Sequence, residues 1–220
     1  MKEETIIKND WCNYFGLTPI SQSKYYKIVG CFVVGFELIR IPNRGLIHPH
    51  FVIYPLWREN FKLCMKTPYH LYGFRDKKNL QAQMSPNELI KKEEEVFDIA
   101  NNYIGYNIKV DIPSIVIYNL MNKYQPNEVN DPWRLMVVAE SNVYQSVYMN
   151  DRDMFAQAIS AMDDVFIRIN PHLKLVESIY GKYEKRKELF VSLFEKQASI
   201  VELIEKNAND SKIKQKIKMV

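Results

Sequence analysis

The stretch from Tyr25 to Ile41 constrains the fold more than any other part of this chain. β-Branched and aromatic side chains dominate it, and both alternating faces are apolar in its middle, which is typical of a strand inside a sheet. The stretch is long for a single strand, so Gly30 or Gly35 is expected to mark a bulge or a bend. A β-sheet with an interior strand early in the chain is therefore predicted.

A returning strand is predicted from Leu46 to Trp57, after a turn at residues 42–45. Its Pro49 and Pro55 cannot donate to a ladder of hydrogen bonds, so this second strand is expected to lie at an edge of the sheet. Apolar pairs favour one register, although a slip of one residue would reverse the faces. In that register Ile41 faces Leu46, Phe36 faces Phe51, Val34 faces Ile53, and Glu37 faces His50.

Most of the remaining chain has helical patterns. Ser85 and Glu88 form a capping box, and the helix that they begin is expected to end at Gly105. The segment from Asp131 to Met149 is rich in valine and tyrosine, so a hairpin is an alternative there, but a helix is favoured. Other helices are expected at residues 3–17, 113–124 and 151–169, a short strand at 107–111, and loops with one short strand or turn at 58–84.

The last segment of regular pattern, residues 173–207, has apolar side chains at three- and four-residue spacing. This spacing predicts a long helix, unless Gly181 breaks it into two. Its apolar arc is broader than that of a two-stranded coiled coil, so packing within its own domain is favoured over a homodimer through residues 173–208. Lys187 and Gln197 interrupt the apolar series, and a dimer seam would place both against a second copy.

These elements together predict an α+β fold. An N-terminal antiparallel hairpin or small sheet, at about residues 20–80, is expected to be covered by a predominantly helical part at about 85–208 that ends in the long helix. A single domain is expected for residues 1–210. Residues 211–220 are basic and are expected to form a frayed tail.

The composition predicts a cytoplasmic protein without membrane contact. Its 47% apolar and 25% charged residues are typical of a globular chain. The longest apolar run, Ile28 to Phe36, is too short to cross a bilayer, and the polar first residues are unlike a signal peptide. Cys12, Cys31 and Cys64 have no CxxC spacing, which indicates free thiols in a reducing compartment.

No complete catalytic motif is present, because G-x-S-x-G, Walker and G-x-G-x-x-G patterns are all missing. Cys64 has basic neighbours, but no nucleophile signature surrounds it and a buried thiol is favoured. His48 and His50 alternate along a strand, with Glu37 expected opposite His50. With a third ligand, such a set could hold zinc or iron. A non-enzymatic protein without a cofactor is favoured over a metal-dependent enzyme at this site.

Basic and aromatic residues are concentrated between residues 40 and 78. Eight Lys or Arg and two acidic residues give this stretch a net charge of +6, whereas the whole chain carries +4. Cations that pair with carboxylates or phosphates, next to aromatic rings that stack, suit an acidic protein partner or single-stranded nucleic acid. The candidate residues of this basic-aromatic segment are Arg40, Arg44, Trp57, Arg58, Lys62, Lys66, Tyr69, Tyr72, Arg75, Lys77 and Lys78.

A cytoplasmic interaction protein is the first functional hypothesis. It would act as an adaptor or an inhibitor that binds an acidic protein partner through the basic-aromatic segment. Nucleic-acid binding through the same residues is the alternative, although no helix-turn-helix, RNP or zinc-finger pattern accompanies them. The metal-dependent enzyme at Glu37, His48 and His50 is the second alternative.

Overall fold

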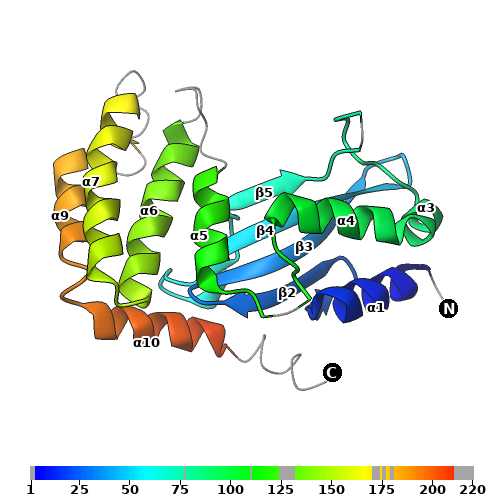
Figure 1. The fold of residues 1–220 in the computed structure, drawn as a ribbon, viewed down its shortest axis with the longest axis horizontal. Helices are drawn as coiled ribbons and strands as arrows, with labels where there is room; N and C mark the ends of the chain where they lie inside the picture. The colour runs from blue at the N-terminus through cyan, green and yellow to red at the C-terminus, as the bar shows by residue number, and fades with distance from the viewer. Residues whose placement is uncertain are drawn as a thin grey trace.

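The structure is a computed structural model that describes residues 3–76, 78–109, 111–123, 132–169, 174, 177–178 and 181–210. Five strands form one antiparallel sheet in the order β1-β2-β3-β4-β5, with helices beside it and across it (Figure 1). The predicted α+β class, with its N-terminal antiparallel sheet, is confirmed. The strands are β1 (Thr18–Ser21), β2 (Lys24–Val29), β3 (Phe32–Ile41), β4 (Leu46–Pro55) and β5 (His70–Gly73).

The β3–β4 hairpin has the predicted register. Ile41 lies opposite Leu46 and Glu37 lies opposite His50, and the two predicted apolar pairs are present. The stretch before it differs from the prediction, because Gly30 turns the chain between β2 and β3 instead of bending one strand. Its φ of +57° is a left-handed conformation that glycine adopts without steric cost.

Strand β4 is not the edge strand that its prolines predicted. Strand β5 pairs with residues 50–53, so β4 lies inside the sheet and β5 lies at the edge. Pro49 and Pro55 flank the segment that pairs with β5, so neither removes a donor from within it. Pro49 also accepts the N–H of Phe74 through its carbonyl oxygen, at 3.0 Å. The prolines therefore mark where this ladder ends.

Helices α1 (Glu3–Phe15) and α4 (Glu93–Ile104) cover one face of the sheet (Figure 1). Tyr25, Phe36 and Phe51 share a row on this face because they are paired across β2, β3 and β4. Trp11 of α1 packs on the row, with its ring centroid 5.1 Å from that of Phe36 and 5.4 Å from that of Phe97 in α4. This aromatic cluster is the core of the sheet layer.

The predictions of where individual helices begin and end were largely correct. Ser85 and Glu88 form the predicted capping box, and Gly105 caps α4 in the left-handed conformation. Lys92 divides the predicted helix into α3 and α4, and no described residue of 107–111 lies in a strand. The favoured helix after Asp131 is confirmed. The other helices are α2 (Phe61–Cys64), α3 (Pro86–Lys91), α5 (Ser114–Lys123), α6 (Pro132–Tyr148), α7 (Arg152–Ile169), α9 (Tyr183–Val191) and α10 (Gln197–Ala208).

The predicted long C-terminal helix is interrupted twice. Gly181 has a φ of +76°, and α9 begins two residues later. A turn at residues 192–196 then separates α9 from α10. The chain can therefore place α9 against α7 and turn α10 across the lower end of α6, as Figure 1 shows. The predicted tail at 211–220 lies outside the described residues.

Lys187, one of the two polar interruptions in the C-terminal pattern, forms an ion pair with a residue of the same chain. Its Nζ lies 2.7 Å from Oδ2 of Asp163, so it joins α9 to α7. Gln197 is half-buried at the start of α10. A homodimer through 173–208 stays a prediction.

Of the helices that the structure describes, none combines the length and the apolarity needed to cross a membrane.

Candidate functional site

The sheet separates the basic-aromatic segment into two groups at opposite ends of β4. That strand has ten residues, so its ends lie about 30 Å apart at ~3.4 Å per residue. The described basic residues of the segment therefore lie on two separate parts of the surface. The end next to the β3–β4 turn carries Arg40, Arg44, Arg75 and Lys78; the other end carries Arg58, Lys62 and Lys66. Lys77 lies outside the described residues.

Two of the three aromatic candidates belong to the core. Trp57 is only 4% exposed, and Tyr69 is also buried. Tyr72 is half-buried, and its ring stacks on Tyr103 with centroids 3.4 Å apart. Trp133 in the first turn of α6, by contrast, is 41% exposed. Because it lies far outside the basic-aromatic segment, the sequence contained no signal that grouped it with the basic residues.

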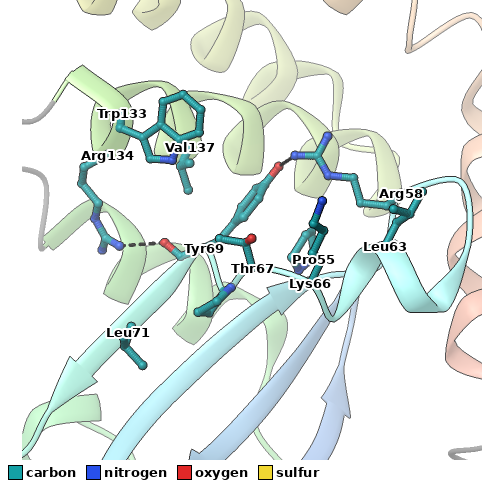
Figure 2. A pocket seen from close by; sticks show the side chains of 11 residues that line it. Pro55, Arg58, Leu63, Lys66, Thr67, Tyr69, Leu71, Trp133, Arg134 and Val137 are labelled. Carbon is teal, nitrogen blue, oxygen red and sulfur yellow. Dashed lines mark hydrogen bonds between the residues drawn. The ribbon is translucent and has the colours of Figure 1, made fainter. Parts of the chain in front are cut away.

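A pocket of about 470 Å³ lies between the β4–β5 connection and the first turns of α6 (Figure 2). We call it the basic pocket, because Arg58, Lys66 and Arg134 line it and none of the lining residues within the described part of the chain is acidic. Its volume is in the range of ordinary ligand sites. The exposed apolar side chains of its lining are Leu63, Leu71 and Trp133.

Tyr69 connects the two arginines of the basic pocket. Arg134 donates from Nη1 to the Tyr69 carbonyl oxygen at 2.9 Å, and Arg58 donates to the Tyr69 hydroxyl group (Figure 2). The same hydroxyl group donates to Oε2 of Glu140 at 2.8 Å. Both guanidinium groups are therefore held by one buried residue, that of Arg58 through the Tyr69 hydroxyl group and that of Arg134 through the Tyr69 backbone carbonyl group.

Glu140 of α6 is the buried anion behind the basic pocket. It is 2% exposed and pairs with Arg58 at 3.4 Å and with Arg186 of α9 at 3.6 Å. Trp57 also donates to it, from Nε1 at 3.4 Å. A buried carboxylate requires such partners because its desolvation is costly. This network fixes Arg58 and joins the β4–β5 connection to α6 and α9.

Asn207 of α10 holds the same connection from the other side. Its Nδ2 donates to the carbonyl oxygens of Leu56 and Arg58, at 2.8 and 2.7 Å. The Asn207 side chain is buried, so these hydrogen bonds are shielded from water. The backbone that presents Arg58 is therefore fixed by a residue about 150 positions later in the chain.

Lys66 differs from the two arginines because it is not tied down. It is exposed, and no side-chain hydrogen bond or ion pair joins it to any residue that the structure describes. Its ammonium group is therefore available to a ligand. Lys62, one turn earlier, is also exposed but does not line the pocket.

His70 lies beside Arg134 at the start of β5. Its Nδ1 is 2.5 Å from Nη2 of Arg134, and its Nε2 faces the hydroxyl group of Tyr103. Burial, together with the charge of Arg134, lowers the pKa of His70 to about 3. A neutral imidazole accepts the Arg134 hydrogen bond through Nδ1. His70 therefore orients Arg134 without adding charge.

The predicted metal ligands lie on the sheet face opposite Tyr25, Phe36 and Phe51. Oε1 of Glu37 accepts hydrogen bonds from the hydroxyl groups of Tyr26 at 2.5 Å and Tyr54 at 2.6 Å. Burial opposes ionisation of Glu37, but these hydrogen bonds and the charge of Lys24 outweigh it and lower its pKa. Glu37 is thus an ionised carboxylate that binds two tyrosines.

His48 and His50 lie together, with ring centroids 4.1 Å apart. Nε2 of His48 is 3.1 Å from the carbonyl oxygen of Phe74, and Nδ1 of His50 is 2.9 Å from that of His48. Burial lowers the pKa of both rings. Across the described ranges, no group of three or more His, Cys, Asp or Glu is arranged to hold a metal ion.

The predicted free thiols are confirmed for all three cysteines. Cys64 is buried in α2, with its Sγ 3.9 Å from the carbonyl oxygen of Arg58. Burial raises the pKa of this thiol, so its basic neighbours in the sequence do not activate it. The favoured interpretation of Cys64 as a buried core residue agrees with this geometry.

Comparison with known proteins found no matching family model, no matching curated protein and no matching solved structure. Function must therefore be argued from the geometry. The basic pocket is the strongest candidate, because it gathers three predicted residues, Arg58, Lys66 and Tyr69, with two that sequence reasoning missed. Those two, Trp133 and Arg134, come from α6.

Proposed function

We propose that this protein binds an acidic protein partner at the basic pocket and acts as an adaptor or an inhibitor. The observation that carries the proposal is the lining of the pocket, where, among the residues that the structure describes, three cations lie beside exposed apolar groups and no side chain is acidic. Arginine and tryptophan are the residue types that contribute most to binding energy at protein interfaces. Charge of one sign steers a partner of the opposite sign and selects against others.

The arrangement of the cations also favours binding. Arg58 is held by Glu140 and Tyr69, and Arg134 is held by His70 and the Tyr69 carbonyl group. Side chains that are already ordered lose little entropy when a partner binds them. Because His70 is neutral, it orients Arg134 without adding a charge of its own. Lys66 adds a flexible third charge at the surface.

Charge reversal tests the proposal. Lys66→Glu places an acid in the lining of the pocket, whereas Arg44→Glu makes the same kind of change at the opposite end of β4. Cross-linking in native extract, followed by mass spectrometry, should recover acidic proteins with the natural chain and with Arg44→Glu. Recovery should fall at least tenfold with Lys66→Glu, because like charges across an interface repel. Equal recovery with both variants would overturn the proposal.

The same variants separate an acidic protein from nucleic acid. Binding of a labelled oligothymidylate through phosphate contacts should weaken steeply as salt rises from 50 to 200 mM. It should also weaken about equally with Lys66→Glu and Arg44→Glu, because both groups of cations would contact phosphates. A flat salt response removes the nucleic-acid alternative and leaves the acidic protein partner.

A further inference from the structure

We infer that the acidic partner presents an extended segment that pairs with the free edge of β5 and directs a carboxylate into the basic pocket. The inference rests on the proposed function and adds to it the conformation of the partner segment. It also adds the backbone groups that recognise that segment. The mode of recognition is strand addition, in which main-chain hydrogen bonds give affinity and side-chain pockets give specificity.

The backbone of β5 has unused hydrogen-bonding groups. Tyr72 is paired with Phe51, and Phe74 donates to Pro49, so these residues point their backbone groups at β4. In an antiparallel ladder the residues between them point the opposite way. Leu71 and Gly73 therefore direct N–H and C=O groups away from the sheet. Among the residues that the structure describes, none bonds to these groups.

The two edges of the sheet are protected differently. Strand β1 carries Pro19, and its pairing with β2 shifts register between Pro19 and Ser21. Prolines and bulges of this kind prevent other chains from adding to an edge. Strand β5 has the sequence His-Leu-Tyr-Gly, without proline, lysine or an irregularity in its pairing. The β5 edge is short, with four residues, but it carries none of the prolines, lysines or bulges that keep another strand away.

The free edge leads directly into the basic pocket. Leu71 lines the pocket and is 52% exposed, and the carbonyl group of Tyr69, two residues earlier, is already taken by Arg134. An added strand would thus begin its pairing at Leu71. Alternate side chains of that strand would point toward the face of Leu71, because successive side chains in a strand alternate.

The charges select the composition of the segment. A side chain that projects from the added strand beside Leu71 meets Lys66, Arg58 and Arg134, and no described residue of the lining is acidic. A carboxylate at that position gains two guanidinium groups and an ammonium group. An alternation of glutamate and apolar residues places every glutamate on the face of Leu71 and the apolar residues on the other face.

Three synthetic peptides test the inference directly. Each alternates glutamate with one apolar residue (valine, leucine or phenylalanine), and each carries a fluorescent label for anisotropy titration against the full chain. At least one should bind, and Lys66→Glu should weaken it at least tenfold while Arg44→Glu leaves it within twofold. Failure of all three peptides to bind overturns the inference.

Backbone methylation of the peptide isolates strand pairing and leaves the protein unchanged. N-methyl groups on the alternate residues that face β5 should weaken binding at least tenfold, because they remove the donors that an added strand needs. Methylation of the other alternate residues should change affinity less than threefold. Equal effects in both peptides overturn strand pairing, and the proposed function survives that result if Lys66→Glu still releases the acidic partner.

Two substitutions at position 71 provide the reciprocal test. Leu71→Pro removes the outward N–H, whereas Leu71→Ala removes the same apolar side chain and keeps that N–H. The N–H of Leu71 does not point at β4, so the ladder of β5 is retained. Leu71→Pro should bind the peptide at least fivefold more weakly than Leu71→Ala. Equal affinities would contradict the inference.

Discussion

His70 is a histidine that the fold keeps without its proton. Its pKa lies at about 3 in the folded chain, against an ordinary value of 6.5, because it is buried beside the guanidinium group of Arg134. In the unfolded chain the same ring takes up a proton as the pH falls below about 6.5. Acid therefore favours the unfolded state through this residue.

The sign of this effect gives a testable pH dependence. The stabilising contribution of the neutral ring is complete above pH 6.5 and is lost as the pH falls toward 3. Each pH unit in that window should remove up to about 1.4 kcal/mol from the free energy of unfolding. Urea unfolding at pH 7, 6 and 5 measures this slope. In His70→Asn, whose side chain does not titrate, the slope should be shallower, and an unchanged slope would contradict the assignment.

Sequence reasoning reached the residues that act through near neighbours and missed those that act across the fold. The alternation of side chains along two strands that a short turn connects predicted that Glu37 lies opposite His50, and this pair is present. His70 and Arg134, by contrast, lie 64 positions apart and meet only because α6 returns to the start of β5. No periodicity within a window of the sequence records such a contact. The residues that α6 contributes to the basic pocket could therefore not be predicted from the sequence.

At the scale of elements, the outcome depends on the length of each signal. The capping box at Ser85 and the left-handed Gly105 are properties of one helix, and both were predicted correctly. Strand β5 has only four residues, too few to show an alternation, so the sequence predicted one short strand or turn within 58–84 but neither its bounds nor its pairing. Without that pairing, the prolines of β4 indicated an edge strand.

Gly73 shows how closely β5 is fitted to its neighbour. A Cβ atom at this position would lie 2.6 Å from Cε1 of His48 and 3.0 Å from Nε2 of His50. Gly73→Ala should therefore lower the free energy of unfolding by about 1–3 kcal/mol, as overpacking does in other cores. Urea denaturation measures the change. In a His48→Ala background the same substitution should cost less, and an equal cost in both backgrounds would show that the His48 ring is not the obstacle.

At the scale of the whole molecule, Glu140 joins the two layers. Arg58 follows the sheet, Glu140 belongs to α6 and Arg186 belongs to α9, so one carboxylate connects three segments. The sheet core and the helical core are separate clusters of apolar side chains, and this polar contact lies between them. Removal of the carboxylate would leave two arginines without their shared anion.

Glu140→Ala should lower the free energy of unfolding by about 3–5 kcal/mol, because it breaks a buried ion pair from one side. Asp163→Ala is the control, since it removes the carboxylate that joins α7 to Lys187 of α9. In that pair the side chains are 49% and 34% exposed, so the loss should stay below about 1 kcal/mol. Chemical denaturation of both variants decides the matter, and similar losses would contradict the role of Glu140.

The hydrogen bonds from Asn207 to the carbonyl groups of Leu56 and Arg58 also determine when the basic pocket can form during synthesis. A ribosome delivers the sheet, Lys66 and the β5 edge long before it delivers α9 and α10. Until α9 and α10 emerge, the backbone at Arg58 lacks Asn207 and the carboxylate of Glu140 lacks Arg186. The basic pocket is thus completed only after α9 and α10 have been made. A nascent chain that still lacks these two helices cannot present the pocket in finished form.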